Sequence, residues 1–322
     1  MNQEVLIDVQ HLTRHYGGYT AVSDISFQVR RGEVLGFLGP NGAGKSTTMN
    51  LLCGVLAPDS GCIRIDAMDL QGQPRQARAR IGYLPERPPL YPELTVREYL
   101  HYCARLHGLS RTDARRALRD ACQRCGLSEV SGRLIAHLSK GFQQRVGIAQ
   151  AIVHSPEVVI LDEPTVGLDP IQIREIRALI RELGEDHSVI LSTHILPEVQ
   201  AVCSRVLMIH QAHLVLDQDL HELSGARPAG LQVALHAPPP LSGLATFAGV
   251  IRVDQLSEDS FLLHHDPADQ SLAERIATQA VQENWRLYRL QPYQPGLEET
   301  FIRLTCGDDA PASNAKPVER QT

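Results

Sequence analysis

A short segment of glycines, a lysine and two hydroxyl residues could bind phosphate. It reads GPNGAGKST over 39–47, between an apolar run at 34–38 that predicts a buried strand and an apolar helix pattern at 49–52. A loop that turns from a strand directly into a helix directs several backbone N–H groups and the positive end of the helix dipole at one point. The pattern therefore predicts a nucleoside triphosphate site.

Individual side chains in this loop have distinct chemistry. Lys45 can reach the β and γ phosphates, and the Ser46 hydroxyl can bind Mg²⁺. The glycines permit backbone angles and a close approach that a Cβ would block. A glycine-rich turn with a chance Lys-Ser pair is the alternative, but such a turn would need neither flanking element. The expected binding residues are Gly39, Pro40, Asn41, Gly42, Ala43, Gly44, Lys45, Ser46 and Thr47.

An acidic pair ends a second apolar run. Asp162 and Glu163 follow four β-rich apolar residues at 158–161, the pattern of a strand covered on both faces. In phosphate-loop enzymes, an Asp at the end of a neighbouring strand holds Mg²⁺, and Asp162 suits this role. Glu163 is then the candidate general base for the attacking water. Taken alone, such a pair is more often a helix cap or a solvated surface pair.

Composition limits the other functions of the chain. Its 322 residues are 43% hydrophobic, and the formal net charge is −6. This charge gives no electrostatic case for nucleic-acid binding, and no nucleic-acid partner is expected. No apolar stretch approaches the ~20 residues that span a bilayer, and the first residues lack a basic and apolar leader. We therefore expect a soluble cytoplasmic chain, with its seven cysteines as free thiols.

Four soft ligands offer a second kind of site. Cys122 and Cys125 form a CxxC, and Cys103 and His107 lie one helical turn apart upstream, so zinc binding is conceivable. However, Leu118 shares one helix face with Cys122 and Cys125, which indicates that these cysteines pack in the core. We favour core packing over metal binding.

The order of the predicted elements indicates an α/β protein with a parallel sheet, because apolar strands alternate with helices. Antiparallel strands are expected at 4–9 and 25–29, and helices at about 95–126. A turn-rich linker at 224–228 precedes a second, small α+β pattern. We expect an ATP-binding domain over 1–223 with a helical subdomain at about 85–150, an accessory domain over 224–305 and a disordered tail over 306–322.

Taken together, residues 4–220 resemble the ATP-binding cassette (ABC) ATPases. The order and the spacing of five motifs carry the resemblance. A signature segment upstream of Walker B is absent from kinases and GTPases, and no guanine-binding Asn-Lys-x-Asp motif is present, so the combination is more specific than the phosphate loop alone. The motifs are Gly39–Thr47 (Walker A), Leu138–Arg145 (signature), Val158–Glu163 (Walker B), Gly167–Asp169 (D-loop) and Ser192–His194 (switch).

The resemblance implies the family's fold: a RecA-like parallel sheet, an N-terminal antiparallel β subdomain and a helical subdomain, followed here by a small C-terminal α+β domain. It implies that Tyr16 stacks on adenine and that His194 bonds the γ-phosphate. Ser139 and Gly141 would meet the γ-phosphate held by a second subunit, with Asp169 across that interface. Two subunits, identical or homologous, would form a head-to-tail dimer closed by ATP.

Three positions depart from the family pattern. Lys140 stands where glycine is usual, and Phe142 where glutamine is usual, but Ser139 and Gly141 are kept, so ATP-driven closure is expected to survive. Glu86 stands where glutamine is usual. Its carboxylate can bind metal beside Mg²⁺ and take part in catalysis, but it adds negative charge near the γ-phosphate and cannot donate a hydrogen bond to water.

Within the family, the chain resembles the ATPase subunits of bacterial ABC-2-type exporters, including those of the gliding-motility type. The segments Gly82–Glu86, Leu138–Phe142 and Leu297–Phe301 carry this likeness. It implies separately encoded membrane permease subunits, a peripheral location on the cytoplasmic face of the cell membrane, and a groove for the membrane partner at about 85–126. A soluble ABC ATPase that acts on ribosomes or nucleic acid is the alternative. The cargo is not readable from this subunit.

Overall fold

The computed structural model describes residues 4–220, 230–266, 269, 271–293, 297, 301 and 304. The chain separates into two compact units, Met1–His221 and Glu222–Thr322. The expected linker at 224–228 and tail at 306–322 lie outside the described residues, as does most of the expected last helix at 297–304.

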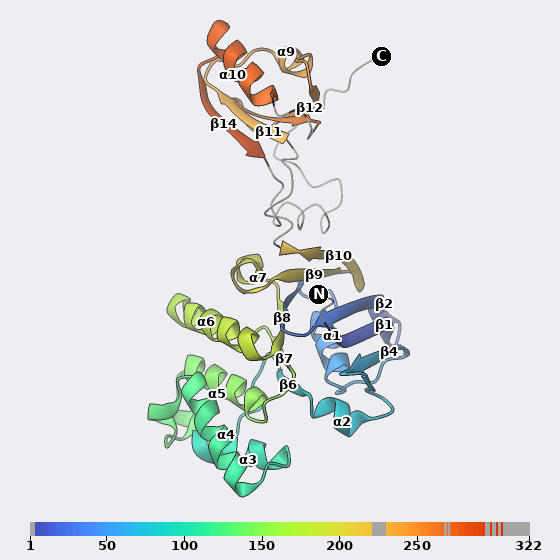
Figure 1. The fold of residues 1–322 in the computed structure, drawn as a ribbon, viewed down its shortest axis with the longest axis vertical. Coiled ribbons are helices and arrows are strands. Elements are labelled where there is room, and N and C mark those ends of the chain that lie inside the picture. The colour runs from blue at the N-terminus through green and yellow to red at the C-terminus, as the bar shows by residue number, and fades with distance from the viewer. Residues whose placement is uncertain are drawn as a thin grey trace. The chain divides into compact units, whose positions relative to one another are not determined.

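A six-stranded sheet forms the centre of the first unit, in the order β10-β9-β3-β8-β7-β6 (Figure 1). The strands β3, β6, β7, β8 and β9 run parallel, and the edge strand β10 pairs antiparallel with β9. All residues of β7 and β8 are buried, as expected for strands that are covered on both faces. The predicted parallel α/β sheet is confirmed. The strands are β3 (Val34–Leu38), β6 (Ile81–Leu84), β7 (Val158–Asp162), β8 (Ser188–Thr193), β9 (Arg205–His210) and β10 (His213–Asp219).

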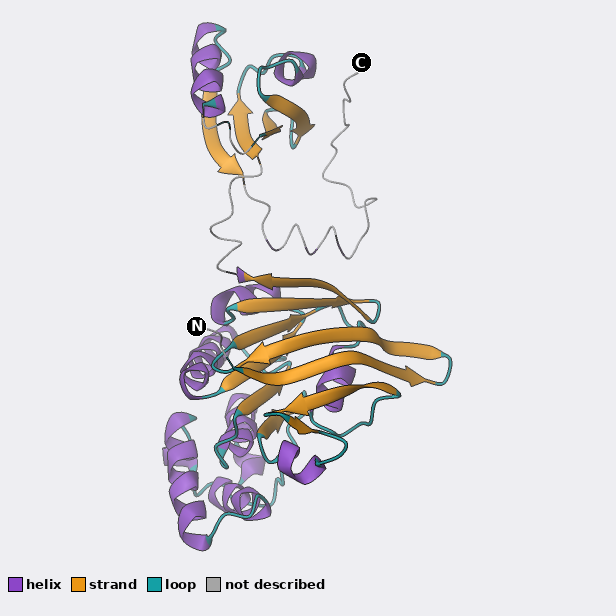
Figure 2. Cartoon of the chain, turned by 45° about the vertical axis from the view of Figure 1, so that its right-hand side comes forward, coloured by secondary structure: helices purple, strands orange, loops and turns teal. Residues whose placement is uncertain are grey.

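A second, antiparallel sheet has the order β2-β1-β4-β5, which confirms the N-terminal β subdomain (Figure 2). Its first two strands form a hairpin and extend well beyond the predicted segments. The register shifts between Val9 and Leu12, and His11 has a positive φ of 52°, so the alternation breaks there although pairing continues. The strands are β1 (Val5–Tyr16), β2 (Tyr19–Arg30), β4 (Ser60–Ile65) and β5 (Met68–Asp69).

The helices α3, α4 and α5 gather into a separate helical region of this unit, apart from the antiparallel sheet (Figure 1). Thr95 caps α3 in a capping box with Glu98, and Ser110 caps α4 by accepting a hydrogen bond from the Asp113 N–H. The helices of the unit are α1 (Lys45–Leu52), α2 (Pro74–Arg78), α3 (Val96–Leu106), α4 (Arg111–Arg124), α5 (Lys140–Ile152), α6 (Pro170–Asp186) and α7 (Leu196–Val202).

The cysteines of the helical region are buried in its apolar core. Cys103, Cys122 and Cys125 belong to one core cluster, where burial raises the pKa of each thiol. His107 instead stacks on His154 with ring centroids 3.6 Å apart. The described residues contain no group of three or more His, Cys, Asp or Glu side chains placed to hold a metal ion. The expected packing role is therefore confirmed by the burial of these cysteines.

The second unit contains a four-stranded antiparallel sheet in the order β12-β13-β11-β14. Its strands and helices enclose a separate apolar core that includes Phe261 and Ile276. The elements are β11 (Gly230–Leu235), α9 (Leu241–Ala245), β12 (Val250–Gln255), β13 (Ser260–His265), α10 (Leu272–Gln282) and β14 (Leu287–Tyr293). Across the described parts of both units, no helix has the length and apolar character needed to cross a bilayer.

Gly82 allows β6 to pack closely against α5. A Cβ at this position would lie 2.0 Å from the backbone oxygen of Ala151. Because a helix backbone atom cannot move aside without distorting the helix, Gly82→Ala should lower the free energy of unfolding by about 1–3 kcal/mol, measured by urea denaturation. Gly18→Ala is the matched control, since its Cβ would meet no atom within 4 Å. Equal losses in both variants would contradict the packing argument.

Candidate functional site

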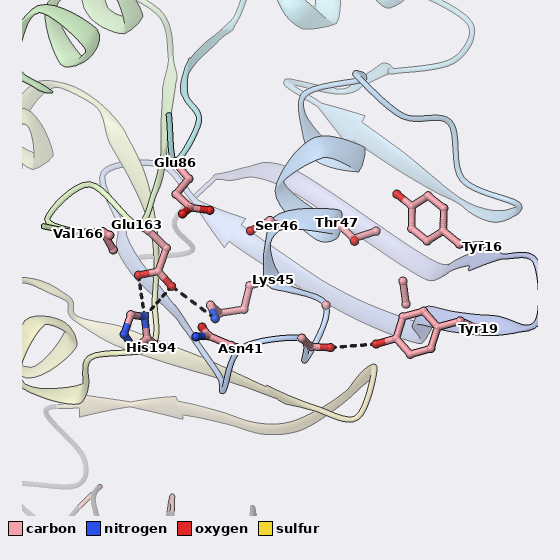
Figure 3. A pocket seen from close by; sticks show the side chains of 13 residues that line it. Tyr16, Tyr19, Asn41, Lys45, Ser46, Thr47, Glu86, Glu163, Val166 and His194 are labelled. Carbon is pink, nitrogen blue, oxygen red and sulfur yellow. Dashed lines mark hydrogen bonds and ion pairs between the residues drawn. The ribbon is translucent and has the colours of Figure 1, made fainter. Parts of the chain in front are cut away.

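Three neighbouring strands deliver the polar residues to one edge of the sheet. In the parallel register, Leu38 of β3 pairs with Thr193 of β8, and Asp162 of β7 pairs with Ser192 of β8. The loops that follow these strands therefore meet. They border a cavity of about 450 Å³ (Figure 3). Its lining residues are Tyr16, Tyr19, Ala21, Asn41, Gly42, Gly44, Lys45, Ser46, Thr47, Glu86, Glu163, Val166 and His194.

The loop between β3 and α1 forms the floor of this cavity and depends on glycine. Gly42 and Gly44 have φ values of 80° and 113°, where a side chain would be strained. A Cβ at Gly39 would lie 2.4 Å from the Ile209 oxygen, and one at Gly44 would lie 2.3 Å from a backbone oxygen of β2. The loop thus has the tight backbone that the sequence predicts for phosphate binding.

Lys45 folds back over the loop. Its side chain is 5% exposed, and Nζ donates hydrogen bonds to the carbonyl oxygens of Gly39 at 2.9 Å and Pro40 at 3.3 Å. Nζ also lies 3.4 Å from Glu163 Oε1. The ammonium group is therefore held at the floor of the cavity, with one buried carboxylate as its counter-ion.

Glu163 joins this lysine to a histidine from the next strand. His194 Nδ1 lies 2.9 Å from Oε2 and 3.0 Å from Oε1 of Glu163, as the dashed lines in Figure 3 show. Glu163 is 6% exposed and has a positive φ of 48°, a strained conformation for a residue with a side chain. The acidic pair is therefore no solvated surface pair.

Asp162, the last residue of β7, is more deeply buried. It is 2% exposed, and its Oδ1 has no hydrogen-bond partner among the described residues. Burial raises the pKa of this carboxyl, and the nearby hydroxyls of Ser192 and Ser46 oppose the rise. An orphaned carboxylate oxygen beside a serine hydroxyl and a phosphate loop is the donor set that a hard divalent cation prefers.

Two tyrosines lie at the other end of the cavity. Tyr16 is 44% exposed, and the Arg14 guanidinium carbon lies 5.2 Å from its ring centre. Tyr19, which the sequence reasoning missed, donates a hydrogen bond from its hydroxyl to the Gly42 oxygen at 3.0 Å. The two residues are paired across the β1–β2 hairpin. Tyr19 could have been predicted from the sequence, because it follows the Gly17-Gly18 turn as Tyr16 precedes it.

The remaining predicted residues divide into two groups. Glu86, just after β6, lies at the cavity near Ser46 and Glu163 (Figure 3). Ser139, Gly141 and Asp169 do not line the cavity.

Two of these outlying residues, Ser139 and Asp169, cap neighbouring helices. Ser139 Oγ accepts from the Phe142 N–H at the start of α5, and Asp169 Oδ1 accepts from two N–H groups at the start of α6. A Cβ at Gly141 would lie 2.6 Å from the Gln172 side chain, and one at Gly167 would lie 2.1 Å from Lys140 Nζ. The helix starts are therefore adjacent to each other, and they do not contribute to this chain's own cavity.

Comparison with known proteins places these features in one family. The family described as ABC transporter matches residues 22–166. The linearmycin resistance ATP-binding protein LnrL of Bacillus subtilis (strain 168) is 32% identical, over 93% of this chain and 98% of its own. The Nod factor export ATP-binding protein I of Paraburkholderia xenovorans (strain LB400) is 31% identical, over 94% of this chain and 97% of its own.

The fold comparison agrees with the sequence comparison. A solved structure described as the ATP binding subunit of an ABC transporter covers 68% of this chain and 92% of its own. The TM-score is 0.62 at 33% sequence identity.

The buried carboxyl of Asp162 gives a pH-dependent prediction. Its raised pKa means that its contribution to stability is full at low pH and is lost as pH rises through the folded-state pKa. Asp162→Asn should therefore raise the thermal midpoint by about 2–4 °C at neutral pH. Thermal scans in EDTA without nucleotide should show this gap shrinking toward about pH 4. A gap that widens as pH falls would overturn the assignment.

Proposed function

Because this chain belongs to the ABC transporter ATP-binding family, we propose that it is the ATPase subunit of an ABC-2-type exporter with separately encoded membrane subunits. ATP binding and hydrolysis follow from the family. The observation that carries the catalytic proposal is the contact of Glu163 with both Lys45 and His194 beside the phosphate loop. One carboxylate there faces the groups that bind a terminal phosphate.

The proposed roles follow from these contacts. The backbone N–H groups of residues 39–47 and the Lys45 ammonium bind the phosphates. Glu163 orients the attacking water and accepts its proton, and His194 bonds both the γ-phosphate and this carboxylate. Tyr16 stacks on the adenine, and the hydroxyl of Tyr19 holds the loop at Gly42.

Ser46, Asp162 and Glu86 are the residues that would hold Mg²⁺. The orphaned buried oxygen of Asp162 fits such a role, because a bound cation would compensate its desolvation. The ion, when bound, neutralises charge on the phosphate oxygens. The chain's part is to place oxygen ligands at the end of β7 and at the start of α1.

A second subunit completes the site in this proposal. Ser139 and Asp169 are exposed at helix starts outside this chain's cavity, so they can face the nucleotide of a partner, whereas Gly141 is buried against the Gln172 side chain, which would have to move aside. The N-terminus of α5 then meets the γ-phosphate across a head-to-tail dimer. ATP-binding subunits of transporters act as dimers with membrane subunits, and the dimer here consists of two such chains or of this chain with a homologue.

The exporter class rests on the relatives. Two relatives that match nearly the whole chain are named for linearmycin resistance and for Nod factor export. These names favour an exporter over a soluble ATPase that acts on ribosomes or nucleic acid. We propose that residues 1–223 form the ATP-binding domain and 224–305 an accessory domain, and that the membrane subunits hold the protein at the cytoplasmic face of the membrane.

Replacement of the proposed base tests the mechanism. Glu163→Gln keeps the size of the side chain but cannot accept the proton, so the ATPase rate should fall by about 10²–10⁴-fold while ATP still binds. Size-exclusion chromatography in ATP and Mg²⁺ should show an accumulated dimer. Glu185→Gln, on the exposed side of α6, is the control and should hydrolyse ATP normally. Rapid hydrolysis by Glu163→Gln would exclude this residue as the base.

Replacement of Glu86 by Gln is expected to speed hydrolysis, whereas the same replacement of Glu163 is expected to slow it. The carboxylate of Glu86 adds negative charge close to the proposed γ-phosphate site and cannot donate a hydrogen bond to the attacking water. Glu86→Gln should therefore raise the steady-state ATPase rate severalfold, measured by phosphate release at saturating Mg-ATP. An unchanged rate would show that Glu86 does not limit hydrolysis.

A further inference from the structure

A buried carboxylate joins the two loops that carry Glu163 and His194, although it lies outside the nucleotide cavity. Glu198, in the first turn of α7, is 1% exposed and does not line the cavity. Removal of an isolated carboxylate from water is costly, so a buried one needs hydrogen-bond donors or a cation around it. The neighbouring elements must therefore supply partners for Glu198.

One oxygen of Glu198 contacts the loop that follows β7. Thr165 Oγ1 donates a hydrogen bond to Oε1 of Glu198, and both residues are buried. This loop runs from Glu163 to Asp169, and within it the Leu168 N–H donates to the Thr165 backbone oxygen at 3.2 Å. Thr165 thus anchors the loop between the proposed base and the residue that caps α6.

The other oxygen of Glu198 contacts the turn after β8. Thr193 Oγ1 donates to Oε2 of Glu198 at 2.9 Å and accepts from the Ile195 N–H at 3.1 Å. These two bonds fix the backbone on both sides of His194. The His194 ring is then directed at Glu163, with Nδ1 2.9 Å from Oε2 (Figure 3).

A guanidinium group compensates the charge of the buried carboxylate. Arg177 Nη2, from α6, lies 3.9 Å from Glu198 Oε1. A buried charged network of this kind contributes little net stability compared with apolar packing of the same volume. A carboxylate can, however, accept two hydroxyl groups at once in a fixed geometry, which an apolar side chain cannot do. The contacts of Glu198 therefore fit a role in positioning better than a role in stability.

We propose that Glu198 is a positioning residue for ATP hydrolysis: it holds His194 at a fixed place relative to Glu163. The two loops meet at two points. The contact between His194 and Glu163 borders the cavity, where a phosphate and water must enter, whereas the contact of Glu198 with Thr165 and Thr193 is buried. The buried contact thus keeps the loops together while the cavity is occupied. The catalytic roles of Glu163 and His194 rest on the proposed function, but the buried contacts do not.

Paired replacements of Thr193 test this role. Thr193→Val keeps the shape of the side chain but cannot donate to Glu198, whereas Thr193→Ser keeps the hydroxyl and loses a methyl group. The kcat of ATP hydrolysis should fall about 10–100-fold in the Val variant and stay within about twofold of wild type in the Ser variant. KM for ATP should be unchanged in both, because Thr193 does not line the cavity. A role in packing alone predicts the reverse order, since only the Ser variant leaves a void.

Two further variants test the connection through the carboxylate. Glu198→Gln keeps one acceptor oxygen and should lose kcat as Thr193→Val does. The double variant Thr165→Val/Thr193→Val should lose no more than either single variant, because either change already breaks the connection. Losses that multiply would show that the two threonines act independently and would overturn the proposal. Ser257→Ala removes a hydroxyl that donates to Asp259 at 2.6 Å on the second unit, and this control should hydrolyse ATP as wild type.

A spectroscopic measurement separates this proposal from the proposed catalytic roles. In nucleotide-free protein with isotope-labelled histidine, the NMR signals of the His194 ring, identified by their loss in His194→Gln, report its contact with Glu163. They should shift in Thr193→Val and Glu198→Gln but not in Thr193→Ser, while the signals of histidines in the second unit stay in place and show that the protein is folded.

The two proposals can fail separately. If the His194 signals shift as expected but Glu163→Gln hydrolyses ATP rapidly, the proposed function fails and the positioning of His194 by Glu198 stands. If Glu163→Gln is inactive and either kcat or the His194 signals stay unchanged in both Thr193→Val and Glu198→Gln, the positioning proposal alone fails.

Discussion

The parallel register of β3, β8 and β7 is the constraint on which the site depends. Hydrogen bonding between these strands fixes Leu38 beside Thr193, and Ser192 beside Asp162. The phosphate loop, the acidic pair and His194 therefore leave the sheet at the same edge, although more than a hundred residues separate the first from the others. Each loop then needs only a few residues of its own to complete the cavity.

This arrangement costs some stability at the two acidic residues. Glu163 has a positive φ, and Asp162 keeps a buried oxygen without a hydrogen-bond partner in the described structure. Both features oppose folding and persist only because the surrounding sheet is well packed. The fully buried strands β7 and β8 supply that packing. The site is thus a place where stability is given up so that a phosphate and a cation can be bound.

The helical region contributes a different kind of surface. Its interior is apolar and contains buried cysteines, whereas α3 and α4 carry exposed arginines on their outer surface. Ser139 caps α5, which extends from the same region, and Asp169 caps the neighbouring α6. In the proposed function, these two helix starts face the nucleotide of a second ATPase subunit.

The sequence by itself determined the phosphate loop, the acidic pair and the parallel α/β sheet, because each depends on a local pattern of residue types. It did not reveal β12, since Val250 and Val253 are buried at a spacing that follows a register shift instead of strict alternation. Only the tertiary structure decided that Tyr19 bonds the loop at Gly42 and that Glu163 is shared between Lys45 and His194. These contacts join residues from different elements, so they depend on packing and strand register, which residue spacing along one segment does not contain.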